Sequence, residues 1–82
     1  MRIWNCKDAR VYDGTPVEIL AQMKLVETAD LRSSLEDYIE AKRHDAQHHW
    51  NVELEVTGDD LETRAASLLD AMVANGLAKR VV

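Results

Sequence analysis

The sequence has 82 residues, of which 46% are hydrophobic, and a formal net charge of −5. A chain of this length holds one small domain with a modest core, and its hydrophobic fraction argues against disorder. The acidic balance disfavours nonspecific binding to nucleic acid and adhesion to anionic membranes. We therefore predict a single small globular domain over residues 1–82.

The cellular compartment is predicted from features that the sequence lacks. The N-terminus carries no apolar run of the kind found in signal peptides, and no stretch approaches the roughly 18 apolar residues that span a bilayer. Cys6 is the only cysteine, so no internal disulfide can form. We expect a cytoplasmic protein without a membrane partner.

The first predicted element is a β-hairpin. Residues 2–6 and 10–13 are short runs with β-branched and aromatic members, and three residues separate them. Neither run alternates cleanly between apolar and polar side chains, so the sequence does not indicate which face of the hairpin is buried.

The first predicted helix begins after Asp13-Gly14. Thr15 suits the N-cap, Pro16 suits the first helical position, and Glu18 can complete a capping box with Thr15. The apolar stripe that follows is broad and predicts a largely buried helix. Its positions are Val17, Leu20, Ala21 and Lys24/Leu25, with Ile19, Met23 and Val26 beside them.

The second predicted helix has a clear stripe and an uncertain start. Thr28, Asp30, or Ser33 with Glu36 as a capping box could each begin it. Spacings of three and four define the stripe, which consists of Leu31, Leu35, Tyr38, Ile39 and Lys42.

Residues 50–57 alternate almost perfectly and predict a half-buried strand. The side chains expected on its buried face are Trp50, Val52, Leu54 and Val56.

A third helix is predicted from a capping box at Asp59 and Glu62 to about Ala74. Asn75-Gly76 is the expected stop, with the glycine in the left-handed region and Leu77 folding back. Residues 77–82 form either a short terminal strand or a flexible tail.

The predicted order is β-β-α-α-β-α, with a last β optional. This order indicates an α+β fold with helices packed on one face of a small antiparallel sheet. The alternative is a three-helix bundle with a minor hairpin attached.

The most suggestive cluster of polar side chains is a run of histidines at the end of the second predicted helix. His44 and His48 are four residues apart and share a helix face, so both could reach one metal ion. His49 pairs with Asp45 at the same spacing, and Cys6 could add a soft ligand. The competing interpretation is that the helix dipole favours cationic side chains near a helix C-terminus.

No catalytic or nucleotide-binding motif occurs, and the glycines are isolated. We therefore expect neither an enzyme nor a cofactor. A helix-turn-helix is disfavoured because Asp30, Glu36 and Asp37 surround the single Arg32 at the start of the second helix.

Trp4 and Tyr12 are the candidate partner-binding residues. Both lie on short strands of a hairpin, and strand edges pair readily with other chains. The alternative is that Trp4 fills a core that has no phenylalanine.

The stretch from Val11 to Met23 reads Val-Tyr-Asp-Gly-Thr-Pro-Val-Glu-Ile-Leu-Ala-Gln-Met. It resembles a junction in small bacterial proteins of unassigned function, in which a strand ending in Tyr-x-Gly-Thr-Pro precedes a helix with Glu-Ile. The resemblance implies a bacterial origin and assigns no catalytic or binding residue.

Taken together, the sequence favours a protein-interaction or accessory domain that contacts a protein partner or itself. One alternative is a metal-binding protein that uses His44, His48 and His49. A second alternative is an accessory protein in nucleic-acid transactions.

Overall fold

The computed structural model describes residues 1–29 and 32–81, and it confirms the α+β class. Its elements in chain order are β1 (Arg2–Asn5), β2 (Arg10–Asp13), α1 (Pro16–Thr28), α2 (Leu35–Trp50), α3 (Leu61–Ala74) and β3 (Ala78–Arg80). Three residues used in the sequence predictions, Asp30, Leu31 and Val82, lie outside the described residues.

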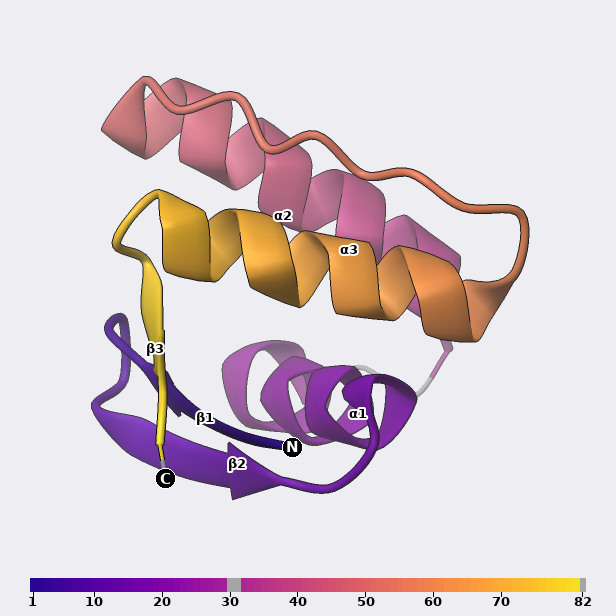
Figure 1. Ribbon diagram of the computed structural model, residues 1–82. Coiled ribbons are helices and arrows are strands. Elements are labelled where there is room, and N and C mark those ends of the chain that lie inside the picture. The colour runs from indigo at the N-terminus through magenta and orange to yellow at the C-terminus, as the bar shows by residue number, and fades with distance from the viewer. Residues whose placement is uncertain (30–31, 82) are drawn as a thin grey trace.

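The sheet is antiparallel, in the order β2-β1-β3. Ile3 pairs with Tyr12 on one side and with Arg80 on the other. Ile3, Tyr12 and Ala78 are all buried, so they mark the face of the sheet that the helices cover. Figure 1 shows the three helices on one side of the sheet, as predicted.

One hydrophobic core joins the sheet to the helices. The sheet contributes Ile3, Tyr12 and Ala78, and the remaining core residues come from the helices and the connection before α3. They are Ile19, Leu20, Met23, Tyr38, Ile39, Ala46, Leu54, Ala65, Leu68, Leu69 and Met72.

The capping box predicted at the start of α1 is confirmed. Glu18 N–H donates to Thr15 Oγ1 at 3.2 Å, and Thr15 N–H donates to Glu18 Oε1 at 3.0 Å. Pro16 occupies the first turn, where its missing N–H leaves no hydrogen bond unmade. Together these contacts fix the start of α1, which only Gly14 and Thr15 separate from β2.

The N-caps of the other two helices each lie one residue after a position that the sequence offered: Ser33 was one of three candidates for α2, and Asp59 was predicted for α3. Ser34, not Ser33, caps α2 by accepting a hydrogen bond from Asp37 N–H at 3.1 Å. Asp60, not Asp59, caps α3 by accepting from Thr63 N–H at 2.7 Å. Two adjacent residues of capping type stand at each site, and sequence alone does not separate them.

The predicted strand over residues 50–57 is wrong. Trp50 is the last residue of α2, and Asn51 ends that helix in the left-handed region with φ 52°. The segment that follows is extended, but no strand pairs with it in the described part of the chain. Figure 1 shows it running back along α2 and α3 before α3 begins.

The alternation predicts burial correctly over residues 52–56, although no sheet forms there. It is wrong at Trp50, which was expected on the buried face and is 60% exposed at the end of α2. Leu54 is buried and Glu53 and Glu55 are exposed, as the pattern predicts. Side chains, in place of a neighbouring strand, form hydrogen bonds with backbone groups of this segment. Arg43 Nε donates to Leu54 O at 3.1 Å, and Thr57 N–H donates to Ser67 Oγ at 2.9 Å.

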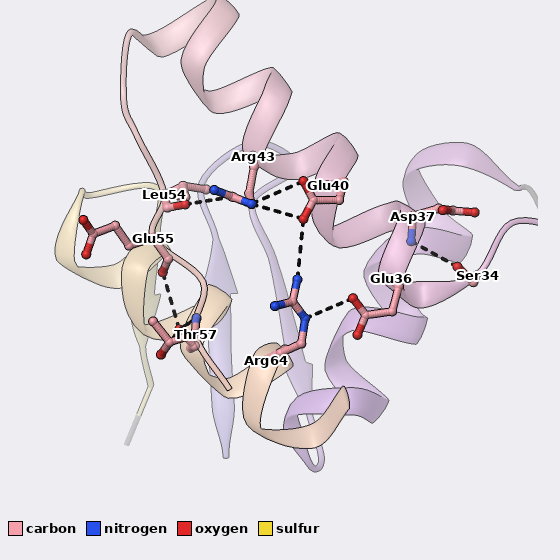
Figure 2. Close-up of polar contacts among 10 residues, drawn as sticks. Ser34, Glu36, Asp37, Glu40, Arg43, Leu54, Glu55, Thr57 and Arg64 are labelled. Atoms are coloured by element: carbon pink, nitrogen blue, oxygen red, sulfur yellow. Dashed lines mark hydrogen bonds and ion pairs between the residues drawn. The ribbon is translucent and has the colours of Figure 1, made fainter. Parts of the chain in front are cut away.

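Arg64 of α3 forms ion pairs with two glutamates of α2 (Figure 2). Its Nε lies 3.0 Å from Glu36 Oε2, and its second terminal nitrogen lies 3.5 Å from Glu40 Oε1. Glu40 also pairs with Arg43 at 3.1 Å within α2, so Arg64 joins α3 to a row of charged residues on α2.

The end of α3 and the tail follow the prediction closely. Leu77 N–H donates to Met72 O at 2.8 Å, and Gly76 N–H donates to Val73 O at 3.2 Å. Gly76 has φ +76°, the left-handed conformation that this helix stop requires. The tail then forms the short strand β3. None of the helices described here is both long enough and apolar enough to cross a membrane.

Candidate functional site

The histidines lie near one another on the exposed end of α2. The rings of His44 and His48 stack with centroids 5.9 Å apart, and the rings of His48 and His49 meet edge-on at 5.1 Å. Among the described residues, no group of three or more His, Cys, Asp or Glu side chains is placed to hold a metal ion. The metal-binding alternative therefore gains no support from convergence of ligands.

Cys6 and His49 instead line a pocket of about 320 Å³. Its walls come from the turn after β1, the C-terminal half of α2, Leu54, Met72 and the turn before β3. The apolar lining comes from residues such as Ala46, Leu54 and Leu77. Trp50, whose residue surface is 60% exposed, also lines this pocket.

Asn5 is the most deeply buried polar residue of the pocket. It is 1% exposed, and its Oδ1 accepts from Lys7 N–H at a long 3.4 Å. Its Nδ2 is the buried side-chain nitrogen that has no hydrogen-bond partner within the described residues. Buried polar groups without partners are rare in folded proteins, and each calls for a physical explanation.

Lys42 also lines the pocket, but its charge is satisfied elsewhere. Lys42 Nζ lies 2.6 Å from Glu27 Oε1, and Tyr38 Oη donates to Glu27 Oε2 at 2.9 Å. Burial and the Glu27 carboxylate raise the pKa of Tyr38 well above its ordinary value. The Lys42 stem therefore forms part of the pocket wall while its ammonium group faces Glu27.

Trp4 and Tyr12, the partner-binding candidates, face opposite sides of the sheet. Tyr12 is 4% exposed and donates a hydrogen bond to Asp8, and burial followed by this bond raises the pKa of Tyr12. Trp4 is half-buried on the face away from the helices, where Lys79 Nζ lies 5.5 Å from its ring centroid. Of the pair, only Trp4 presents surface to a partner.

A second surface, between β2 and α1, combines an open strand edge with exposed apolar side chains. Val11, Leu25 and Val26 line a shallow depression there, and their exposed fractions are 53, 54 and 44%. We call these three residues, with the β2 edge, the edge groove. The open edge arises because β2 pairs only with β1 among the described strands.

The edge groove corrects the predicted stripe of α1. Ala21, Leu25 and Val26 were expected to be buried with the rest of the stripe, but all three are exposed. The stripe is wider than the neighbouring elements can cover, so its outer part faces solvent. The unusual width of the apolar stripe on α1 was the feature of the sequence from which the edge groove could have been predicted.

Two basic side chains of the sheet, Arg2 and Arg80, are paired with acids. Arg2 contacts Asp13 at 3.4 Å, and Arg80 contacts Asp70 of α3. These pairs offset positive charge that could otherwise meet phosphates.

No protein-family model, curated protein or solved structure matches this chain.

Proposed function

We propose that this chain is a protein-interaction domain without catalytic activity, which binds an extended segment of a partner chain along the edge groove. The observation that carries the proposal is the juxtaposition of an unpaired strand edge with three exposed apolar side chains. Strand addition needs both features: main-chain groups that supply hydrogen bonds, and an apolar surface that takes alternate side chains.

The backbone of β2 leaves hydrogen-bonding groups at its open edge. Gly14 N–H donates to Met1 O at 3.0 Å, so Gly14 and Tyr12 direct their main-chain groups toward β1. Val11 and Asp13, which alternate with them, direct theirs outward. Gln22 Nε2 of α1 already donates to Asp13 O at 3.0 Å, which confirms this direction. Val11 therefore offers both its N–H and its C=O to an added strand.

The side chains of the edge groove supply the apolar part of the site. Leu25 and Val26 lie on α1, on the helix side of the β2 edge, whereas the Val11 side chain lies on the other face of β2, with its cross-strand neighbour Trp4. A segment laid along β2 would bury parts of all three side chains, at roughly 25 cal/mol for each Å² of apolar surface removed from water. Alternate residues of that segment would point toward Leu25 and Val26, and the residues between them would lie on the face of Val11, as the period of an extended strand requires.

The edge groove is preformed. The capping box and Pro16 fix the start of α1, and the Tyr12 side chain is anchored in the core by its bond to Asp8. A partner segment would then meet a rigid surface, which reduces the entropy lost on binding.

Selection from a displayed library of random peptides, with the wild-type domain as bait, tests this proposal. Enriched peptides should carry apolar residues at every second position. Val11→Pro should weaken binding, because it removes the outward N–H that an added strand would use. The variant should still fold, because this N–H makes no hydrogen bond to β1 and proline is tolerated on an open strand edge. Circular dichroism checks that the variant folds.

Matched variants separate the edge groove from other surfaces. Leu25→Lys should weaken binding, whereas Ala41→Lys, an exposed position on α2, should leave it unchanged. Three results would contradict strand addition: no enriched peptide, equal binding to Val11→Pro, or binding that depends on Trp4 alone.

A further inference from the structure

We infer that the pocket lined by Asn5 and Cys6 is a small-molecule site for an uncharged compound that combines a compact apolar body with a carbonyl oxygen. This site is distinct from the edge groove, and none of its lining residues belongs to that surface. The two proposals therefore stand or fall separately.

The size and lining of the pocket set the apolar body. A pocket of about 320 Å³ is near the lower end of the range for small ligands, roughly 300–1,000 Å³. Ala46, Leu54, Met72 and Leu77 contribute its apolar wall. A single ring with a short substituent suits such a space.

Asn5 sets the polar group. Its Nδ2 is a hydrogen-bond donor, since Lys7 N–H donates to the other end of the amide and thereby fixes which atom is oxygen. A donor without a partner calls for an acceptor, and because Nδ2 is itself buried, a ligand carbonyl oxygen can accept from it once the amide turns toward the pocket. The bond from Lys7 is long at 3.4 Å, so a small rotation of the amide toward the pocket loses little energy.

The charges around the pocket favour an uncharged ligand. Lys42 is paired with Glu27, and the two remaining charged lining residues, Lys7 and Asp45, have opposite signs. A ligand carboxylate or ammonium would gain from one of them and be repelled by the other.

Acetophenone and ethylbenzene form a matched pair of probes, because the two differ by a carbonyl in place of a methylene group. The side-chain amide resonances of Asn5 in a ¹H–¹⁵N spectrum report binding directly. Acetophenone should shift them and bind roughly two- to tenfold more tightly than ethylbenzene, as one net hydrogen bond implies. Without that bond, the more apolar ethylbenzene would bind at least as well.

Cys6 supplies a second readout. It is the only cysteine, and its thiol donates to Gly76 O at 3.3 Å in the turn that borders the pocket. Acetophenone in the pocket should slow the reaction of Cys6 with a disulfide reagent. In Ala46→Leu, where the larger side chain fills the pocket, acetophenone should not change the reaction rate of Cys6. In Ala41→Leu, on the exposed face of α2, acetophenone should slow the reaction as it does in wild type.

Asn5→Leu removes the donor and should abolish the preference for acetophenone while the pocket remains. If this buried variant does not fold, the comparison of acetophenone with ethylbenzene on the wild-type protein still decides the question. Three results would overturn the inference: binding of neither probe, equal or tighter binding of ethylbenzene to wild type, or acetophenone binding that leaves the Asn5 resonances unmoved.

Discussion

Lys42 Nζ lies 2.6 Å from Glu27 Oε1, although the two side chains are only 9 and 12% exposed. The pair connects the middle of α2 to the end of α1, and Tyr38 donates to the second oxygen of the same carboxylate. One carboxylate thus satisfies an ammonium group and a hydroxyl that the core would otherwise leave unpaired. This small network positions α1 and so supports the edge groove.

Glu27→Gln should lower the free energy of unfolding by about 3–5 kcal/mol, because it leaves the Lys42 charge buried without a counterion. Urea denaturation measures the loss. Glu53→Gln makes the same chemical change at an exposed residue and should stay within about 0.5 kcal/mol of wild type. Equal stability of the two variants would mean that Lys42 reaches solvent.

Stability should decrease as the pH falls through the acidic range. The Thr15 N–H bond lowers the pKa of Glu18, and the Thr63 N–H bond lowers the pKa of Asp60. Because each folded-state pKa lies below its unfolded value, both carboxylates stabilise the fold at neutral pH. That contribution disappears as the pH falls below about 4, through the folded pKa values.

The double variant Glu18→Gln/Asp60→Asn isolates this contribution. Its urea midpoint should depend less on pH between neutral and acidic conditions than the midpoint of wild type. Glu53→Gln/Asp59→Asn, with two exposed acids changed, is the matched control and should keep the wild-type slope. Parallel curves for all three proteins would refute the assignment to the caps.

Leu68→Ala should destabilise the fold by about 2–5 kcal/mol, since Leu68 is fully buried in the core and alanine leaves a cavity. Leu25→Ala is the same substitution at a residue that is 54% exposed, and it should change stability by less than about 0.5 kcal/mol. Thermal or urea unfolding of both variants checks the register of α3. A loss of stability in Leu25→Ala as large as that in Leu68→Ala would show that Leu25 is packed and that the edge groove is not open.

Ser67→Ala should loosen the extended segment before α3. Ser67 Oγ accepts from Thr57 N–H at 2.9 Å and donates to Glu55 O at 3.4 Å (Figure 2 labels Thr57 and Glu55). Amide exchange at Thr57 should accelerate, and the free energy of unfolding should fall by about 0.5–1.5 kcal/mol. Unchanged exchange at Thr57 would show that packing of Leu54 and Val56 holds the segment without this hydrogen bond.

Local features of this chain were predictable from sequence, because neighbours within four residues determine them. The capping box at Thr15 and the helix stop at Gly76 are both of this kind. Burial along residues 52–56 was also predictable, because it follows the alternation of side chains. The predicted strand failed because a sheet needs a partner strand, whereas here Arg43 and Ser67 pair the backbone.

Contacts between distant residues were beyond the sequence patterns. Lys42 stood out on an apolar stripe, but nothing in the pattern identified Glu27 as its partner fifteen residues earlier. Likewise the pocket brings Asn5 together with Ala46 and Leu77, which come from three separate parts of the chain. The candidate metal cluster illustrates the converse: sequence spacing brings the histidines near one another without arranging them around an ion.

Amide hydrogen exchange at Val11 and Tyr12, with and without a peptide from the library selection, tests strand addition most directly. These neighbours on β2 form an internal control, since Tyr12 directs its N–H toward β1 and Val11 directs its N–H outward. Strand addition predicts fast exchange at Val11 in the free domain and slow exchange in the complex, with Tyr12 protected in both. Exchange at Val11 that stays fast in a saturated complex would contradict it.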